Sequence, residues 1–502
     1  MAVQNADRIA LPLDLTPAHR RRVLLRLAGE LGTKSPRTRR RFLATLVGNA
    51  GRALRAAGLQ ATVRQEWSRI WVDVADPGHV PVARRAVADL FGTHSAAEVL
   101  EVPAPSLSAL VTALEPVYRE RVRGHTFGIR ARRAGTTSIA PQDLAVELGA
   151  ALLPVSAGVN LDHPEVQVQV IVGEHSAYAC LEESPGPGGL PLSTGGRALA
   201  LLSGGFDSPV AAWHVMRRGV DVELVHFDLG GCGQVEAAME VARALVHRWA
   251  PGVSVPVHVV DLARLMTALQ ERCDRRLRQV LLKRAMYRAA GQLGRELEVE
   301  ALVTGEALAQ VSTQTLRSLA VCEEAAGMVV LRPLIGMDKT EIIARATAIG
   351  TREASEGVQE ECAIAGGKVI TWPHLASVRT AEAMVAGEAT DAWAAGQVAR
   401  RRVIDASTWQ PVSPAVGVRE VESVPSGAEL IDVREPYEGE PVGTLQLPYS
   451  VAMERIDLLR PDQDYVLVCT TGQRSAALAG RLHDRGYRAW SLRGGLRRLP
   501  RA

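Results

Sequence analysis

Residues Leu201–Val210, with the sequence LLSGGFDSPV, combine features that can hold phosphate groups. An apolar strand would end at Ser203, a glycine pair would allow a tight turn, and a helix would begin near Ser208. Glycines let a phosphate approach the backbone, and the unpaired N–H groups at a helix N-terminus attract anions. No Gly-Lys-Ser/Thr follows, so this is not a Walker loop. The pattern predicts a pyrophosphate site of another type, with an ordinary strand–turn–helix corner as the alternative.

Cys469 stands at the C-terminal end of a second predicted strand, Tyr465–Cys469, and a helix is predicted from Ser475 to His483. A loop of this length can curl its N–H groups around the sulfur. The helix N-terminus and Arg474 would then favour a thiolate or persulfide anion. The loop that we expect to surround the sulfur consists of Thr470, Thr471, Gly472, Gln473, Arg474 and Ser475.

Lysine is rare in this chain, which has four lysines and 54 arginines. A lysine that remains is expected where a compact ammonium is needed and a planar guanidinium would not fit. Lys283 lies in one predicted helix and Lys339 begins another, so each could stabilise charge on phosphates. Each could also be an ordinary exposed helix lysine. The segment Val303–Thr315 follows a strand and could clasp a nucleoside, with Gly305 and Gln314 as the expected contacts.

Charge is unevenly distributed along the chain. Residues 1–135 carry 22 basic and 11 acidic side chains, and the rest of the chain carries 36 basic and 44 acidic ones. A basic first quarter indicates that an anionic polymer binds there. A solvated surface in an arginine-rich proteome is the alternative.

Length and pattern predict a multidomain α/β protein, because 502 residues are too many for one core. Two α+β units come first, strands alternating with helices then predict a doubly wound parallel sheet, and a smaller α/β unit ends the chain. The expected domains are residues 1–85, 86–186, 187–405 and 411–502. No run is apolar enough to span a membrane, no signal segment begins the chain, and the six cysteines lack zinc-ligand spacing. We therefore expect a cytoplasmic protein with no metal site of its own.

The segment Ser203–Ser208, SGGFDS, resembles the signature of the PP-loop ATP pyrophosphatases. These enzymes activate a carbonyl or carboxylate by adenylation and release pyrophosphate. The resemblance implies that Asp207 acts through Mg²⁺ or by polarising the site. The residues expected to bind ATP are Leu201, Leu202, Ser203, Gly204, Gly205, Asp207, Ser208, Lys283, Gly305 and Gln314.

The last segment resembles a rhodanese domain. Besides the Cys469 loop, Leu430–Tyr437 (LIDVREPY) and Leu492–Leu496 (LRGGL) match two further rhodanese motifs. The resemblance implies that Cys469 carries a persulfide.

The order of these parts resembles the tRNA uridine 4-sulfurtransferase family, also known as the thiamine-biosynthesis sulfurtransferases. Gly29–Ser35, Val303–Gln314 and Leu331–Lys339 are close to family motifs. The resemblance implies an N-terminal ferredoxin-like domain and a THUMP domain that bind tRNA, followed by PP-loop and rhodanese domains. The residues expected to contact tRNA are Lys34, Arg37, Arg39, Arg40, Arg41, Arg130, Arg132 and Arg133.

The resemblance also implies a mechanism. ATP, with Mg²⁺, adenylates the C4 oxygen of uridine 8 of tRNA, and a cysteine desulfurase loads sulfur onto Cys469. The persulfide, or sulfide released from it, displaces AMP, and Cys362 closes a disulfide with Cys469. Asp207, Lys339, Cys362 and Cys469 are the expected catalytic residues. Ala363 follows Cys362 where the family usually has glycine.

A second family task, sulfur donation to a sulfur-carrier protein for the thiamine thiazole, is also implied. Two alternatives stay open: a thiazole sulfur donor that does not act on tRNA, and a non-catalytic RNA-binding protein. The basic N-terminal quarter argues against the first, and the intact Asp207, Lys339, Cys362 and Cys469 argue against the second. The sequence leaves the oligomeric state open, a homodimer included.

Overall fold

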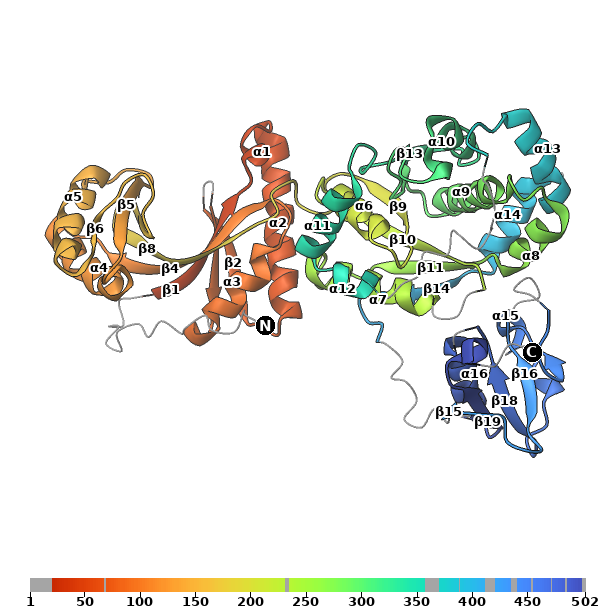
Figure 1. Ribbon diagram of the computed structural model, residues 1–502. Coiled ribbons are helices and arrows are strands. Elements are labelled where there is room, and N and C mark those ends of the chain that lie inside the picture. Colours follow the sequence, from red (N-terminus) through yellow and green to blue (C-terminus); the bar gives the residue numbers. More distant parts are fainter. Residues whose placement is uncertain are drawn as a thin grey trace. The chain divides into compact units, whose positions relative to one another are not determined.

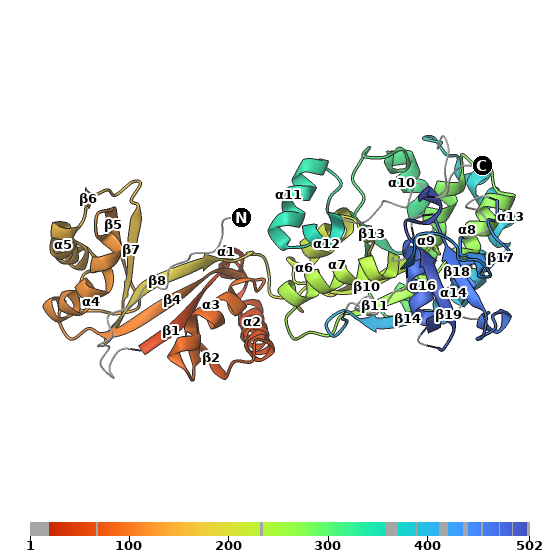
Figure 2. The ribbon, with the colours of Figure 1, turned by 60° about the horizontal axis from the view of Figure 1, so that its bottom comes forward.

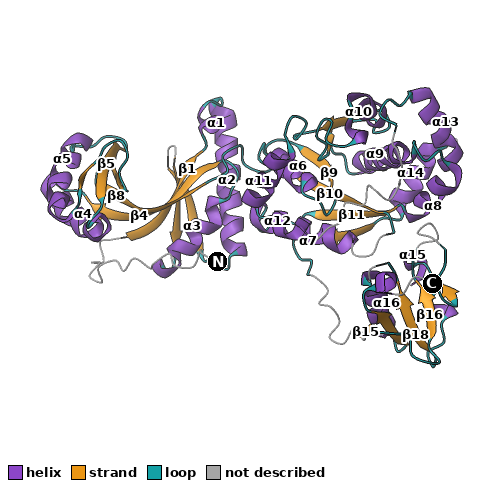
Figure 3. Ribbon diagram, in the orientation of Figure 1, coloured by secondary structure: helices purple, strands orange, loops and turns teal. Residues whose placement is uncertain are grey.

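The structure is a computed structural model that describes residues 20–66, 69–230, 234–356, 370–387, 389–410, 420–434, 440–452, 455–470, 472–483 and 485–498. The chain divides into two compact units, residues 1–194 and 195–502 (Figure 1). Helices and strands alternate through most of both units (Figure 3). Among the described residues, no helix is long and apolar enough to cross a membrane.

One eight-stranded sheet, in the order β2-β3-β1-β4-β8-β7-β5-β6, forms the base of the first unit. Neighbouring strands are antiparallel except that β5 runs parallel to β6 and β7. The strands are β1 (Arg20–Leu27), β2 (Ala61–Glu66), β3 (Arg69–Val74), β4 (Thr93–Pro103), β5 (Thr126–Arg133), β6 (Gly158–Val159), β7 (Val166–Val172) and β8 (Ser176–Pro185). The helices are α1 (Gly29–Gly32), α2 (Pro36–Ala56), α3 (Val80–Ala88), α4 (Leu107–Val122) and α5 (Pro141–Leu152).

Two apolar cores lie between this sheet and its helices, which confirms the two expected α+β units. Helices α2 and α3 cover one end, and α4 and α5 cover the other. The long strand β4 joins them, because Ala96 packs in the first core and Leu100 in the second. The domain boundary expected between residues 85 and 86 falls inside α3, whose Val87 and Ala88 still belong to the first core.

The second unit begins with a six-stranded sheet in the order β13-β12-β9-β10-β11-β14. All neighbours are parallel except β14, so the expected doubly wound sheet is confirmed with an antiparallel edge (Figures 1 and 2). Its strands are β9 (Arg197–Leu201), β10 (Asp221–Asp228), β11 (Pro256–Asp261), β12 (Ala301–Val303), β13 (Val329–Leu331) and β14 (Arg402–Asp405). Its helices are α6 (Asp207–Met216), α7 (Gln234–Trp249), α8 (Ala263–Arg272), α9 (Arg278–Glu296), α10 (Leu316–Glu323), α11 (Lys339–Ile349), α12 (Arg352–Glu356), α13 (Leu375–Ala386) and α14 (Thr390–Ala399).

The C-terminal part has its own sheet of five parallel strands, in the order β15-β19-β18-β16-β17. This confirms the expected rhodanese-like α/β fold. Strand β18 is central, and side chains along it point alternately into two cores. Leu467 and the residue after the strand, Cys469, lie in one core, and Val466 and Val468 lie in the other. The elements are β15 (Glu420–Val421), β16 (Glu429–Asp432), β17 (Leu445–Gln446), α15 (Tyr449–Ala452), β18 (Asp464–Val468), α16 (Gln473–His483) and β19 (Arg488–Leu492).

The first compact unit extends to residue 194, beyond the boundary expected at residue 187. Residues 187–194 belong to the first compact unit. The amide of Asn49 donates to the carbonyl of Leu192, and Leu190 packs in the first core. Buried leucines therefore hold this glycine- and proline-rich stretch against the first unit.

Candidate functional site: a phosphate cradle and a sulfur loop

The predicted phosphate corner connects β9, which ends at Leu201, to α6, which begins at Asp207. Two serine side chains shape the turn between them. The Ser203 N–H donates to Ser208 Oγ at 2.9 Å, and the two hydroxyls lie 3.1 Å apart. The Gly205 N–H donates to Ser203 Oγ at 3.3 Å. The first turn of α6 is thereby presented at the carboxyl end of the sheet, where its N–H groups can meet an anion.

Asp207 and Lys339, two residues that we predicted to be catalytic, meet at this corner. Lys339 Nζ lies 2.7 Å from Asp207 Oδ1, although 132 positions separate them in the sequence. Lys339 is the first residue of α11, which the Asp338 side chain caps. Both charged side chains remain partly exposed, at 34% for Lys339 and 22% for Asp207. The pair can therefore reach a bound phosphate while its geometry is held by two helix N-termini.

Gly305 also belongs to the site. A Cβ atom at this position would lie 2.7 Å from Asp207 C and from Ser208 N, which is too close for any side chain. The loop after β12 is therefore pressed against the first turn of α6, and glycine is required for that approach.

Glu306, the next residue, organises a buried charge cluster that the sequence did not reveal. Its carboxylate accepts from Lys283 Nζ at 3.0 Å, from Arg332 Nε at 3.0 Å and from Tyr287 OH at 2.5 Å. Burial opposes ionisation of Glu306, but Lys283 and Tyr287 outweigh it and hold its pKa below the usual value. Burial and the Glu306 charge raise the pKa of Tyr287. Lys283, which is predicted to touch ATP, is bound to Glu306, one residue from Gly305 of the cradle.

Two further residues lie within hydrogen-bond distance of backbone carbonyls of the cradle. The imidazole Nδ1 of His226, on β10, lies 3.0 Å from the carbonyl oxygen of Leu202. Burial lowers the pKa of His226. The buried hydroxyl of Ser355, on α12, donates to the Gly205 carbonyl at 3.3 Å. Neither residue lies in a motif, so only tertiary contacts identify them.

Gln314 lies at the end of the same loop, 8% exposed. Its side-chain Oε1 is buried without a hydrogen-bond partner among the described residues. The next residue, Thr315, donates through Oγ1 to the carbonyl of Thr371 at 2.9 Å. The loop that starts at Gly305 therefore ends beside the chain that follows the Cys362 segment.

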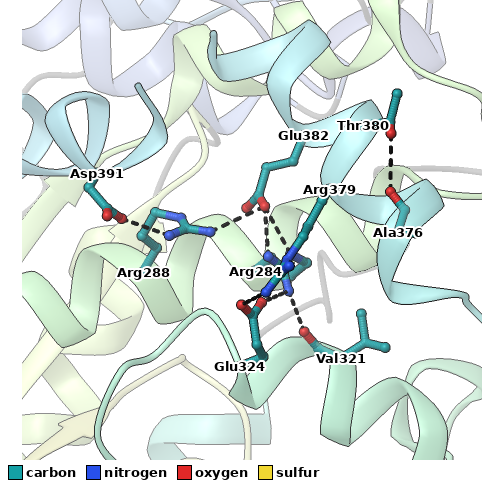
Figure 4. Close-up of polar contacts among 9 residues, drawn as sticks. All are labelled: Arg284, Arg288, Val321, Glu324, Ala376, Arg379, Thr380, Glu382 and Asp391. Carbon is teal, nitrogen blue, oxygen red and sulfur yellow. Dashed lines mark hydrogen bonds and ion pairs between the residues drawn. The ribbon is translucent and has the colours of Figure 1, made fainter. Parts of the chain in front are cut away.

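A second buried ionic cluster starts from Arg284, which follows Lys283 on α9 (Figure 4). Its guanidinium is fully buried and donates to Glu382 on α13, to Glu324 near the end of α10 and to the carbonyl of Val321. Burial opposes the charge of Arg284, but the bonds to Glu382 and Glu324 outweigh it and raise its pKa. Arg288 also reaches Glu382, at 3.2 Å. The cluster ties the helix after the Cys362 segment to the helix that carries Lys283.

The sulfur of Cys469 is cradled as predicted. The Gly472 N–H donates to Sγ at 3.1 Å, and the Ser475 hydroxyl donates to it at 3.6 Å. Cys469 is 1% exposed. Gly472 has φ +93°, a backbone conformation that favours glycine. A persulfide sulfur on Cys469 would extend beyond this buried Sγ, with the α16 N-terminus beside it.

The LRGGL segment closes the other side of the loop. The Leu496 N–H donates to the Cys469 carbonyl at 2.9 Å. A Cβ on Gly495 would lie 2.2 Å from that carbonyl oxygen and 2.6 Å from Gly472 N. The two rhodanese motifs are therefore one packed unit. The expected loop member Arg474 is half-buried, whereas Thr471 lies outside the described residues.

Cys362, the predicted partner of Cys469 in a redox disulfide, lies outside the described residues. The chain on both sides of its segment is described. Ser355 precedes it and bonds to Gly205, and Thr371 follows it and bonds to Thr315. Both flanks thus contact the cradle or its loop.

The eight predicted tRNA-contacting residues fall into two groups on the first unit. Five surround the start of α2, which Ser35 caps and Pro36 begins, and three lie on β5. None forms an ion pair with a residue that the structure describes, in contrast to Arg21, Arg22 and Arg26 of β1, which pair with carboxylates. No carboxylate that the structure describes therefore neutralises the positive charge of these eight residues.

Comparison with known proteins identifies the family. Residues 193–409 match the family model described as "Thiamine biosynthesis protein (ThiI)", and residues 22–97 match its ferredoxin-like domain. The chain is 36% identical to a tRNA sulfurtransferase of Desulfurococcus amylolyticus, over 95% of this chain and 97% of that one. The chain belongs to the tRNA sulfurtransferase family. Its enzymatic class is therefore transfer of sulfur to tRNA.

Other relatives agree with this assignment. A tRNA sulfurtransferase of Marinobacter nauticus is 33% identical over 93% of this chain and 98% of its own length. Among solved structures, a 4-thiouridine synthetase in complex with RNA and ATP matches with a TM-score of 0.67 and 27% identity. It covers 77% of this chain and 99% of that one. The family assignment therefore agrees with both the cradle and the sulfur loop.

Proposed function

We propose that this sulfurtransferase binds ATP at the cradle, adenylates the C4 oxygen of uridine 8 of tRNA, and replaces that oxygen with sulfur to give 4-thiouridine. The pairing of Asp207 with Lys339 at the first turn of α6 is the observation that carries the proposal. An ammonium and a helix N-terminus aimed at one point can stabilise negative charge as it develops on phosphate. The solved relative that holds ATP and RNA supports the same substrates here.

The activation step exchanges one bond at phosphorus. The uridine C4 oxygen attacks the α-phosphorus of ATP, the bond to the β-phosphate oxygen breaks, pyrophosphate leaves, and the N3 proton is lost to solvent. Ser203, Ser208 and the amides around Gly204 would bind the phosphates, and Lys339 would neutralise charge on them. Mg²⁺ would fit beside the Asp207 carboxylate, where it would offset phosphate charge.

The sulfur step begins with Cys469 persulfide, formed with a cysteine desulfurase as donor. In one route its terminal sulfur attacks C4, AMP leaves, and Cys362 thiolate then attacks the Cys469 sulfur to release 4-thiouridine. In the other, Cys362 attacks first and the released sulfide displaces AMP. Both routes end with a Cys362–Cys469 disulfide, which a thiol reductant must reduce by two electrons. The contacts of Ser355 and Thr371 support a role for Cys362 in either route, because they hold both flanks of its segment at the cradle or its loop.

We propose that the tRNA is held by the two unpaired basic groups, at the start of α2 and on β5. Their positive charge has no carboxylate partner among the described residues, so phosphates can neutralise it.

A sulfur-carrier protein of thiazole synthesis is a second proposed acceptor for the Cys469 sulfur. The thiamine-biosynthesis description of the matched family model supports it.

The decisive experiment incubates the protein with unmodified tRNA, ATP, cysteine and a cysteine desulfurase, and then measures nucleosides by mass spectrometry. We expect 4-thiouridine at position 8 only when ATP is present. Cys469→Ala should abolish thiolation while tRNA binding is retained, and Asp207→Ala should abolish pyrophosphate release. Thiolation without ATP, or undiminished turnover by Cys469→Ala, would refute the proposal.

A further inference from the structure

Trp372 is the most exposed tryptophan in the described part of the chain, with 65% of its surface accessible, and Leu316 beside its anchoring loop is 71% exposed. A single exposed apolar side chain requires no explanation. Trp372 differs because the backbone around it is held in place. Ile370 N–H donates to the Arg276 carbonyl at 3.2 Å, and the Thr371 carbonyl accepts from Thr315. The indole is therefore exposed on a fixed support.

Arg317 lies against the same indole. Its guanidinium carbon is 5.9 Å from the ring centroid, and its Nε donates to the Pro373 carbonyl at 3.2 Å. No described carboxylate forms an ion pair with it. An aromatic face with an adjacent unpaired guanidinium is the combination that binds an unstacked RNA base together with its phosphate.

The Thr315–Thr371 hydrogen bond also joins the chain before the indole to the loop of the cradle. Thr315 follows Gln314, whose buried Oε1 has no donor among the described residues. The loop that contains them begins at Gly305, which presses on Asp207. The loop that bonds to the backbone of Thr371 is therefore the same loop that shapes the nucleotide cradle.

We propose that Trp372 and Arg317 form the platform on which the target uracil of tRNA stacks, on a support that Thr315 holds at the end of the cradle's loop. The inference rests on the proposed function and adds the residues that recognise the base. Trp372 is ten positions after Cys362, so the platform lies on the chain that follows the Cys362 segment.

The test compares Trp372→Ala, Trp372→Phe and, as a matched control, Met384→Ala, whose side chain is 64% exposed on α13. Stacking contributes enough per base that the alanine variant should raise the KM for tRNA by about 10- to 100-fold, with the KM for ATP unchanged. The phenylalanine variant should recover most of the loss because it keeps an aromatic face. Met384→Ala should match the unsubstituted protein.

A second readout locates the base directly. Product tRNA that carries 4-thiouridine is irradiated in the near ultraviolet in the complex, and crosslinked peptides are identified by mass spectrometry. We expect crosslinks to the peptide that contains Trp372. An unchanged KM for tRNA in Trp372→Ala, a rise confined to the KM for ATP, or crosslinks that avoid this peptide would each overturn the platform. Absence of 4-thiouridine with the unsubstituted protein would instead refute the function on which it rests.

Discussion

Replacing Glu382 with glutamine should loosen the junction between α9 and α13 without altering any residue proposed to meet ATP or tRNA. Glu382 is 7% exposed, and its Oε2 accepts from Arg284 Nη2 at 2.7 Å, from Arg284 Nε at 3.1 Å and from Arg288 at 3.2 Å (Figure 4). Glutamine keeps the shape but removes the charge. The fully buried Arg284 would then retain Glu324 as its one carboxylate partner among the described residues, beside neutral acceptors such as the Val321 carbonyl.

The size of the effect follows from burial. Removing one partner of a buried ion pair costs about 3 to 5 kcal/mol, and the low end applies because Glu324 remains. A loss of about 3 kcal/mol increases the equilibrium for local opening by roughly 150-fold. The matched control is Arg379→Gln, which breaks a 2.6 Å pair with the same Glu324 at a site where Arg379 is 58% exposed. Such an exposed pair contributes less than about 1 kcal/mol, so that variant should change opening by less than about fivefold.

Hydrogen exchange of the full-length protein, read by mass spectrometry, measures this opening peptide by peptide. Peptides of α9 and α13 should exchange much faster in Glu382→Gln, whereas peptides of the C-terminal sheet should not change. Equal exchange in Glu382→Gln and Arg379→Gln would refute the reasoning, because it would mean that the buried charge is not held by its partners.

Three further predictions follow from the site and the basic groups. The pKa of Glu306 is held below its usual 4.5, so ionised Glu306 stabilises the fold above that pH. This stabilisation is lost as the pH falls through the lowered pKa. In Glu306→Gln, the melting temperature should therefore depend less steeply on pH in the acid range. Gly305→Ala would place a Cβ 2.7 Å from backbone atoms of the cradle, so the KM for ATP should rise at least about tenfold in steady-state assays while tRNA affinity measured by filter binding is unchanged. Arg40→Ala with Arg41→Ala should weaken tRNA binding and lower the slope of log affinity against log salt by about 1 to 2, and an unchanged slope would remove these arginines from the interface.

The local motifs were predictable because each depends on residues that are neighbours in sequence. The strand–glycine–helix pattern at 201–210 and the loop after Cys469 both form as the spacing indicated, and Lys339 does begin a helix. The hydrogen bonds within each motif, from Ser203 to Ser208 and from Ser475 to Cys469, span six positions or fewer. Alternation of strands and helices was likewise enough to predict parallel sheets, because a parallel connection needs a crossover helix.

Long-range pairing was not predictable. The pairing of Lys283 with Glu306 is one example, because nothing near either residue in the sequence indicates it. The same applies to Ser355, which reaches Gly205 from 150 positions away. The expected boundary at residue 187 also missed that Leu192 is bound to the first unit.

The sequence by itself determined which chemistry this protein can carry, because an SGGFDS turn and a cysteine loop create their electrostatic environments from adjacent backbone amides. Tertiary structure alone decided which charges neutralise one another, since a buried carboxylate such as Glu306 or Glu382 is stable only beside cations that the folded sheet brings to it. The same long-range pairing brings Lys339 to Asp207 at the cradle and Lys283 to Glu306 beside it, and it leaves the predicted tRNA-contacting arginines without an ion pair among the described residues.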